Sequence, residues 1–386
     1  MTRVAFYAPM KPPDHPVPSG DRQMAQAFAA LLASLGHEVE IACRFRSYDR
    51  TGDVARQERL RRLGQRLAGR LAERYRERPP AERPACWFTY HLYHKAPDWL
   101  GPNVAQRLAI PYLVAEASVA RKRAQGPWAF GYAASRQAIA AADLVLAMTL
   151  QDADGLADVT QPGRVLLFPP FLDTRPFVAA AARRAAHRDQ LAARYGLDPA
   201  QPWLLAVAMM RADVKERSYA LLAKALALCL ASDWQLLLVG DGEARPAVEA
   251  GFAACVPSER VRLLGRLPES ELPGVHAAAD LYVWPALAEA YGMAMLEAQA
   301  AGVPVVAGAE GGVPDILADG ECGVLVSSGD PAALAAGVQK LLADPERRRT
   351  MGARAQRRMV AEHDVSVARA RLAEALARIG LSGASG

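Results

Sequence analysis

The chain has 386 residues, a length that suggests two or three domains with sizeable cores. Hydrophobic residues make up 52% and charged residues 23%, which excludes a disordered or fibrous protein. The net charge is a modest +5, and no apolar run is long and uncharged enough to span a membrane.

The beginning of the chain and its cysteines indicate the compartment. The first seven residues contain one charged side chain and a short apolar run, which predicts a strand and not a signal peptide. The cysteines form no C-x2-C pair, which argues against a zinc site or a disulfide framework and for a reducing cytoplasm. They are Cys43, Cys86, Cys229, Cys255 and Cys322. We therefore expect a cytoplasmic protein.

In the first half of the chain, short apolar runs alternate with helical patterns. The predicted strands are residues 4–8, 39–43, 86–91, 111–115 and 144–149. Strands that alternate with helices imply a parallel sheet covered on both faces.

An arginine-rich segment separates the second and third predicted strands. Residues 44–83 hold thirteen arginines and six acidic residues, and Leu60, Leu63, Leu67 and Leu71 recur at helical spacing. An ordinary surface helix that packs these leucines on its own domain explains the pattern, and a helix lying on an anionic membrane is the alternative. Aromatic residues are sparse there and no nucleic-acid-binding module is present, so we expect no nucleic-acid partner.

A proline-rich seam divides the chain. Residues 168–176 contain three prolines and precede a predicted helix over 179–195. A second series of predicted strands follows, at residues 203–209, 234–239, 260–264, 281–284, 303–307 and 323–326. Two such series predict an α/β fold of two doubly wound domains, residues 1–175 and 176–355. Residues 356–386 form a charged helical tail that we expect to pack back on the first domain.

The most specific segment follows the strand that ends at Trp284, since ligands of doubly wound sheets bind at the carboxyl ends of strands. Glu289 lies in the loop after this strand, Gly292 opens a helix, and Glu297 lies on its second turn. Backbone N–H groups at the helix start form an anion site. Glu297 can accept two ribose hydroxyls, and Glu289 can reach the group on the other side of the phosphate. Two carboxylates that bracket a phosphate site indicate a nucleotide sugar.

This segment resembles the family-4 retaining glycosyltransferases of the GT-B fold. Their E-x7-E hallmark runs from Glu289 to Glu297, and the family's glycine-rich series follows at residues 302–306, 311–316 and 320–326. The resemblance covers nearly the whole chain. It implies two facing, Rossmann-like domains with a central cleft.

On the donor side, the resemblance assigns two cations. Arg211 and Lys215 follow the first strand of the second domain, where the family has a Gly-Arg…Lys-Gly segment, and would contact the donor diphosphate. Charge-assisted hydrogen bonds of about 1.5–3 kcal/mol each should stabilise the departing diphosphate more than a helix dipole of about 0.3–1 kcal/mol. Met210 replaces a usual glycine, and Ala286 and Ala290 stand where the family often has serine and glycine. We expect the two alanines to change local packing but not activity, and Met210 to change the path of the loop.

Further donor contacts follow from the same match. The helix start at Gly292, Met293 and Ala294 would bind phosphate, and the base would lie near Arg266 and Leu267. A UDP- or GDP-sugar is the donor substrate implied, with no other cofactor and no metal.

The acceptor side is expected in the first domain. Ser19 and Gly20 match the family's glycine-rich loop, and Gly20 permits close backbone approach to the donor phosphate and the acceptor. This loop is long and proline-rich, however, and a rigid surface linker fits it as well. His91 and His94 end the third predicted strand, where the family often has a histidine, and His91 is the better match. Their H-x2-H spacing does not predict a metal, because no third ligand is evident and a strand aims the two side chains to opposite faces.

Other polar residues follow the fourth and fifth predicted strands. Glu116 stands where many relatives have a histidine and would orient or deprotonate an acceptor hydroxyl; pairing with a nearby arginine is an equal alternative. Arg121 and its basic neighbours would bind an anionic acceptor. Asp152 and Asp154 form a D-x-D sequence, which helix capping explains without a metal.

Together these features predict transfer of a hexose from a nucleoside diphosphate sugar to a hydroxyl acceptor with retention of configuration. The predicted catalytic residues are Glu289, Lys215, Arg211 and His91. Resemblance to retaining relatives implies front-face attack, in which the departing phosphate helps take the acceptor proton. The acceptor is a glycan, a lipid-linked sugar or a small metabolite, and peripheral contact with the inner face of the membrane stays open. A nucleotide-sugar 2-epimerase of the same fold and a non-catalytic membrane-surface protein are the alternatives.

Overall fold

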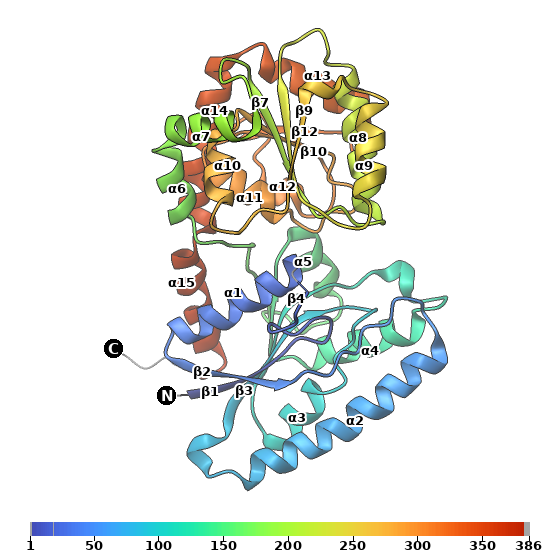
Figure 1. The fold of residues 1–386 in the computed structure, drawn as a ribbon. Helices are drawn as coiled ribbons and strands as arrows, with labels where there is room; N and C mark the ends of the chain where they lie inside the picture. The colour runs from blue at the N-terminus through green and yellow to red at the C-terminus, as the bar shows by residue number, and fades with distance from the viewer. Residues whose placement is uncertain (1, 18, 382–386) are drawn as a thin grey trace. The chain divides into compact units, whose positions relative to one another are not determined.

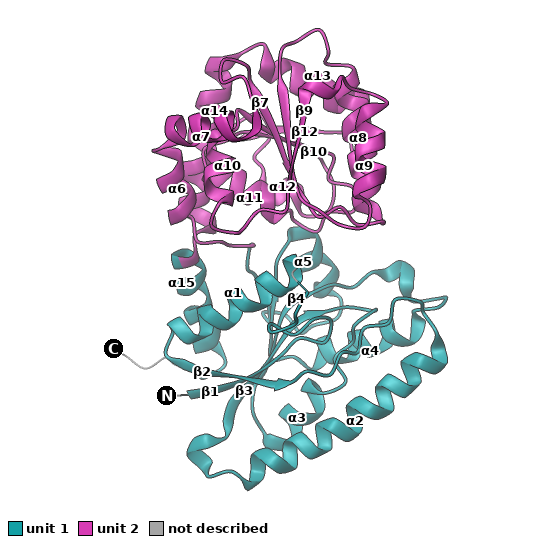
Figure 2. Ribbon diagram, in the orientation of Figure 1, with its two compact units in different colours: residues 1–169, 366–386 teal, residues 170–365 magenta. Residues whose placement is uncertain are grey.

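The computed structural model describes residues 2–17 and 19–381, which divide into two compact units (Figure 2). Unit 1 comprises residues 1–169 and 366–386, and unit 2 comprises residues 170–365. The boundaries fall at 169/170 and 365/366, where the sequence suggested 175/176 and 355/356.

Hydrogen bonds explain where these boundaries fall. The backbone N–H of Leu172 donates to the carbonyl oxygen of His363 over 3.0 Å. The hydroxyl of Thr174 donates to Asp364 Oδ2 over 2.6 Å, and both side chains are buried. These bonds tie the segment after residue 169 to the last residues of unit 2.

Unit 1 is built on a six-stranded sheet with the strand order β2-β1-β3-β4-β5-β6, and its strands pair in parallel (Figure 1). The strands are β1 (Thr2–Tyr7), β2 (His37–Cys43), β3 (Pro84–Leu92), β4 (Tyr112–Ala117), β5 (Leu144–Ala147) and β6 (Val165–Leu167). The sheet confirms the predicted doubly wound architecture. Strand β6 was not predicted, because three half-exposed residues at a sheet edge are too short to show a pattern.

The helices of unit 1 are α1 (Gly20–Ser34), α2 (Val54–Glu77), α3 (Gly101–Leu108), α4 (Ala129–Ala141), α5 (Leu150–Ala157) and α15 (Val365–Arg378), with short 3-10 turns η1 (Pro80–Glu82) and η2 (Arg121–Arg123). Aromatic rings fill part of the core: Phe6 stacks on Phe88 at 5.3 Å between ring centroids, and Phe28 packs 5.6 Å from Phe88. Helix α15 returns to this unit, where the Arg369 side chain donates to the carbonyl oxygen of Ser34.

Unit 2 repeats the architecture with the order β12-β11-β10-β7-β8-β9. Its strands are β7 (Trp203–Val207), β8 (Gln235–Val239), β9 (Val261–Gly265), β10 (Leu281–Trp284), β11 (Val305–Gly308) and β12 (Gly323–Val326). Strand β7 lies between β8 and β10, so the chain leaves β7 toward one edge and later returns to its other side. The carboxyl ends of β7 and β10 are therefore the switch point at which doubly wound sheets bind ligands.

The helices of unit 2 are α6 (Arg175–Ala181), α7 (Arg184–Tyr195), α8 (Val214–Ala227), α9 (Arg245–Ala253), α10 (Leu272–Ala278), α11 (Met293–Ala300), α12 (Val313–Ile316), α13 (Pro331–Leu342) and α14 (Pro345–Arg358), with the 3-10 turn η3 (Ser258–Arg260) and the π-helical turn η4 (Met359–His363). The single helix predicted over 179–195 is two helices, α6 and α7. Arg184 and Arg188 both reach the carboxylate of Asp280, at 2.8 and 2.9 Å, and this clamp sets the position of α7 separately from α6.

The arginine-rich helix α2 packs one face on unit 1. Its buried residues are Gln57, Gly64, Ala68, Leu71, Ala72 and Tyr75. Of the four leucines at helical spacing, Leu71 is buried and Leu63 is 39% exposed, so the leucine stripe and the buried face coincide only in part. Across the described residues, we find no helix with the length and apolarity needed to cross a membrane.

Candidate functional site

The loops after β7 and β10 bring together the two predicted site residues Lys215 and Glu289. Lys215 lies in the first turn of α8, and its Nζ is 2.5 Å from Glu289 Oε2. The indole N–H of Trp284 donates to the same oxygen over 3.2 Å, and Lys215 Nζ lies 5.2 Å from the centre of that ring. The two charged side chains are only 18% and 17% exposed. A cation, a carboxylate and an indole thus form one partly desolvated cluster at the switch point.

The loop that carries Glu289 has an unusual backbone. Ala286 and Ala288 both have left-handed backbone angles, with φ of 59° and 47°, and each costs about 1–2 kcal/mol in a residue with a Cβ. A Cβ on Gly311 would overlap with the carbonyl oxygen of Glu289, and the neighbouring Gly312 N–H donates to Ala290 O over 2.6 Å. The surrounding glycines therefore hold this strained loop in place.

Helix α11 starts at the end of this loop. Gly292 is its N-cap, with φ of 78°, and no side chain caps the helix. The N–H groups of the first turn are thus not taken by a side-chain acceptor, which is the requirement for an anion site. Met293, Ala294 and Glu297 are partly exposed, whereas the intervening Met295 is buried. The predicted phosphate and ribose residues share one exposed side of the helix start.

Behind Glu297 lies His276, which the sequence did not single out. Its Nε2 is 3.2 Å from Glu297 Oε2, and the histidine is fully buried. The ring stacks on Tyr282 at 5.9 Å, and the Tyr282 hydroxyl donates to Val207 O at the end of β7 over 3.2 Å. His276 lies 21 residues before Glu297 in α10, and no local motif could have indicated this contact.

A glycine pair after β8 supports the loop that leads to Lys215. Gly240 and Gly242 have φ of 145° and 152°, and a Cβ on either would overlap with the carbonyl oxygen of Ala208 or Met210. Met210 N donates to Asp241 O over 3.0 Å, and Met210 is buried. The Gly-Asp-Gly sequence directly after a predicted strand is a local signal for this contact.

The other predicted donor residues lie outside the cluster. Arg211 Nε is 3.1 Å from Asp213 Oδ2, and its side chain is 42% exposed. Arg266 follows β9 and is exposed, whereas Leu267 packs against the core of unit 2. Of the two predicted cations, Lys215 alone contacts Glu289.

In unit 1, His91 at the end of β3 meets two acidic residues. His91 Nδ1 lies 2.9 Å from Asp21 Oδ1, in the first turn of α1, and 3.7 Å from Glu116 Oε1 near the end of β4. Both His91 and Glu116 have left-handed φ, 61° and 56°. Such backbone angles in residues with large side chains concentrate at functional sites. His91 is thus the cation beside Glu116, in place of the arginine that the sequence left open.

The charges of this group act on one another. Burial by itself would lower the pKa of His91, but the carboxylates of Glu116 and Asp21 raise it to about 9. Burial raises the pKa of Glu116, and nearby His91 opposes that shift. His91 therefore carries a positive charge at neutral pH.

Of three further predicted residues in unit 1, Ser19 and Arg121 have structural contacts, and Gly20 has open space beside it. Ser19 caps α1 by accepting from Arg22 N over 3.3 Å, and it also accepts from Lys11 Nζ over 2.9 Å. A Cβ on Gly20 would meet nothing within 4 Å, so the approach to its backbone is open. Arg121 is exposed and pairs with Asp158.

Two more residues named in the sequence analysis, Asp152 and His94, have separate structural contacts. The N-cap of α5 is Thr149 and not an aspartate of the D-x-D sequence. Asp152 lies in the first turn, where its Oδ2 accepts from the Thr149 hydroxyl over 2.7 Å and its N–H donates to Thr149 Oγ1 over 3.0 Å. His94 does not face the group around His91; its ring packs edge-on to Trp128 at 6.0 Å.

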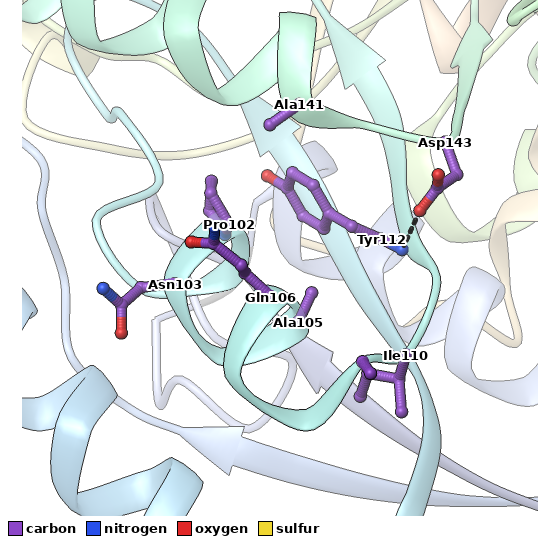
Figure 3. A pocket seen from close by; sticks show the side chains of 9 residues that line it. Pro102, Asn103, Ala105, Gln106, Ile110, Tyr112, Ala141 and Asp143 are labelled. Carbon is purple, nitrogen blue, oxygen red and sulfur yellow. Dashed lines mark hydrogen bonds between the residues drawn. The ribbon is translucent and has the colours of Figure 1, made fainter.

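A cavity of about 530 Å³ lies in unit 1 at the amino ends of the strands, away from the carboxyl ends that carry His91 and Glu116 (Figure 3). Its lining includes Tyr112 and Asp143, at the amino ends of β4 and β5, and Asp143 accepts from Tyr112 N over 2.9 Å. Ligands of doubly wound sheets bind at the carboxyl ends of the strands, so this cavity is not the candidate site.

Comparisons with known proteins give a matching family model and similar proteins. The family model described as Glycosyl transferases group 1 matches residues 202–358. The chain is 35% identical over 233 residues to the D-inositol 3-phosphate glycosyltransferase of Salinispora tropica, a match that covers 57% of this chain and 48% of that protein. The chain spans about half the length of several of the curated relatives it matches.

Two solved structures resemble the fold over nearly its whole length. Sucrose-phosphate synthase from Thermosynechococcus elongatus has a TM-score of 0.76 and 21% identity, covering 98% of this chain and 99% of that one. Anabaena Alr3699/HepE in complex with UDP has a TM-score of 0.74 and 17% identity, covering 98% of this chain and 100% of that one.

Proposed function

Residues 202–358 belong to the glycosyl transferases group 1 family, and from this premise we propose that the chain transfers a hexose from a nucleoside diphosphate sugar to a hydroxyl acceptor with retention of configuration. Two six-stranded parallel sheets and the structural neighbours identify the GT-B fold. The observation that carries the proposal is the Lys215–Glu289–Trp284 cluster at the ends of β7 and β10, beside the uncapped start of α11.

Unit 2 binds the donor in this proposal. The diphosphate gains charge as the sugar departs, and Lys215 and the first N–H groups of α11 stabilise that charge. Lys215 has three N–H donors, so it can bind a phosphate oxygen while it keeps its contact with Glu289. Glu289, held by Lys215 and Trp284, accepts from hydroxyls of the sugar, and Glu297, held by His276, accepts from the ribose.

Unit 1 binds the acceptor. A histidine with a pKa of about 9 is already protonated at neutral pH and does not serve as a general base. His91 instead donates a hydrogen bond and stabilises negative charge. The acceptor oxygen bonds to the anomeric carbon, the bond from that carbon to the phosphate oxygen breaks, and the acceptor proton passes to the phosphate on the same face. This role of the leaving group explains why the site needs no carboxylate nucleophile.

The identity of the substrates is proposed more broadly. A solved structural neighbour is complexed with UDP, and we keep both UDP- and GDP-sugars as donors. Several arginines on the outer side of α2 are exposed, among them Arg59, Arg66 and Arg70, and these support a peripheral contact with anionic lipid.

A donor screen tests the proposal. The purified chain is incubated with UDP- and GDP-sugars and product is detected by mass spectrometry. Slow release of free sugar of unchanged configuration, or its transfer to an added acceptor, supports the proposal. Release of an epimerised sugar would instead identify an epimerase, and vesicle binding without turnover would identify a non-catalytic surface protein.

A further inference from the structure

A cluster of basic and aromatic side chains in unit 1 has no role in the chemistry above. Lys95 follows β3, Arg123 ends the turn η2, and Trp128 is the N-cap of α4. Lys95 Nζ lies 5.0 Å and Arg123 Cζ 4.8 Å from the centre of the Trp128 ring. His94 packs edge-on to the same ring at 6.0 Å between centroids. One indole thus holds two cations and a histidine together.

Among the residues that the structure describes, the positive charge of this cluster is only partly balanced. Among the described residues, neither Lys95 nor Arg123 forms an ion pair. Asp49 is the acid that acts on Lys95, but its carboxylate is shared with Arg56, whose Nε lies 3.6 Å from Asp49 Oδ1. Like charges held close together raise the free energy of the folded state unless an anion joins them.

Hydrogen-bonding groups in the cluster also lack partners. Both ring nitrogens of His94, Nε of Arg123 and Nε1 of Trp128 are buried and make no hydrogen bond with any residue that the structure describes. A buried polar atom without a partner destabilises the folded state, and native proteins rarely leave several of them together. A ligand rich in acceptor oxygens would satisfy these donors.

Titration of the cluster is consistent with such a ligand. Burial, together with Arg123 and Lys95, lowers the pKa of His94 to about 4. Burial and the neighbouring arginines Arg123 and Arg50 lower the pKa of Lys95. A bound anion would reverse the charge repulsion and raise both values.

The cluster lies on the same edge of the sheet as the His91 group. His94 and Lys95 follow β3, and Arg123 and Trp128 follow β4. The Tyr93 ring lies between the two groups, 4.9 Å from His91 and 5.2 Å from His94. A single small molecule can therefore place one end beside Lys95 and Arg123 and another beside His91.

We propose that Lys95, Arg123, His94 and Trp128 form a phosphate-binding subsite, and that the acceptor carries a phosphate monoester group bound there. Anion binding by the cluster stands on the contacts above, whereas its assignment to the acceptor rests on the proposed function. The subsite replaces Arg121, which the sequence suggested and which pairs with Asp158. A planar guanidinium, an ammonium and an indole N–H together match the oxygens of a phosphate.

Binding is tested with the full chain, with inorganic phosphate and glycerol 3-phosphate as probes. The side-chain signals of 15N-labelled histidine are followed by NMR at pH 7 and constant ionic strength, with chloride as the reference anion. We expect saturable shifts of one histidine, assigned to His94 by its loss in H94N. R123Q and K95Q should each weaken phosphate binding at least tenfold, while the matched control R121Q, from the same turn, changes it less than twofold.

The controls separate this subsite from the donor site. R123Q and K95Q should keep the thermal stabilisation given by UDP or GDP, because neither residue belongs to unit 2. Phosphatidic acid vesicles, whose headgroup is a phosphate monoester, are titrated in parallel to identify the source. Vesicle binding that R123Q abolishes assigns the phosphate to a lipid headgroup, and binding of glycerol 3-phosphate alone assigns it to a soluble acceptor. Either result supports the subsite.

Two results would overturn the subsite. One is the absence of any saturable histidine shift with phosphate up to tens of millimolar. The other is an equal loss of phosphate binding in R121Q and R123Q, which would mean general charge attraction. If phosphate binds as expected but no nucleotide sugar is turned over, the subsite stands and the proposed transfer fails.

Discussion

Lys215 Nζ and Glu289 Oε2 lie 2.5 Å apart, although the two residues are 74 positions apart in the sequence. The contact forms because β7 and β10 are neighbours in the sheet and both loops leave the same edge. Trp284, the last residue of β10, adds a hydrogen bond to the carboxylate and covers the ammonium. The carboxylate is therefore held in one orientation before any ligand arrives, which is the condition for electrostatic preorganisation.

Substituting either partner of this pair should nearly abolish turnover. E289A removes the acceptor for the sugar hydroxyls, and K215A removes the cation of the leaving group, so each should lower kcat at least 100-fold. Circular dichroism and thermal unfolding check that both variants stay folded. R217Q, which changes an exposed arginine of the same helix, is a suitable control. Wild-type rates in both E289A and K215A would remove this assignment.

His276 should act on donor binding through Glu297. H276F keeps a ring against Tyr282 but loses the 3.2 Å contact with Glu297, so the donor KM should rise about tenfold with little change in kcat. The wild type should bind the ribonucleoside diphosphate more tightly than its 2′-deoxy analogue, and H276F should bind both alike. H276Q, which can still hydrogen-bond, should recover part of the difference. If H276F still prefers the ribonucleoside diphosphate over its 2′-deoxy analogue as strongly as the wild type does, His276 only fills space.

Gly311 should be intolerant of a side chain. Its φ is 59°, and a Cβ would overlap with the carbonyl oxygen of Glu289, so G311A should lower the free energy of unfolding by about 2–4 kcal/mol and reduce activity. Gly329 has a φ of 78° but open space around it. G329A should therefore show only the backbone cost of about 1–2 kcal/mol. Urea unfolding measures both variants. Equal decreases in the free energy of unfolding for G311A and G329A would contradict the steric explanation.

The charge of His91 should make stability depend on pH. The folded-state pKa of about 9 is above the ordinary value of 6.5, so His91 stabilises the protein fully below about pH 6.5 and loses that effect as the pH rises through 9. The raised pKa of Glu116 also makes the stability of the folded state decrease as the pH rises, starting from the ordinary glutamate pKa of 4.5.

Urea unfolding at pH 6.5 and 9.5 measures this effect. Between these two pH values, the free energy of unfolding of the wild type should decrease by about 1–3 kcal/mol more than that of H91N, because the asparagine side chain does not titrate. H187N, at a half-buried histidine of unit 2, should keep the wild-type dependence. An identical pH dependence in H91N and the wild type would mean that His91 is not charged beside Glu116.

Two pairs of neighbouring predicted residues diverge for the same reason. His91 and His94 are three residues apart, but β3 ends between them and sends them to different neighbours, Asp21 and Trp128. Arg121 and Arg123 are two residues apart, and they also diverge, to Asp158 and Trp128. Sequence spacing indicates a direction only inside a regular element, and all four residues lie at strand ends or in a short turn.

The sequence by itself determined the two doubly wound sheets and the loop and helix that carry Glu289 and Glu297, because alternating strands, helices and turn glycines are local patterns. Only the tertiary structure decided which side chains meet. Lys215 beside Glu289, His276 behind Glu297, and Lys95 with Arg123 around Trp128 all join separate elements. Such contacts depend on strand order and on packing between elements, and these arise from the burial of the whole chain and not from the spacing of neighbouring residues.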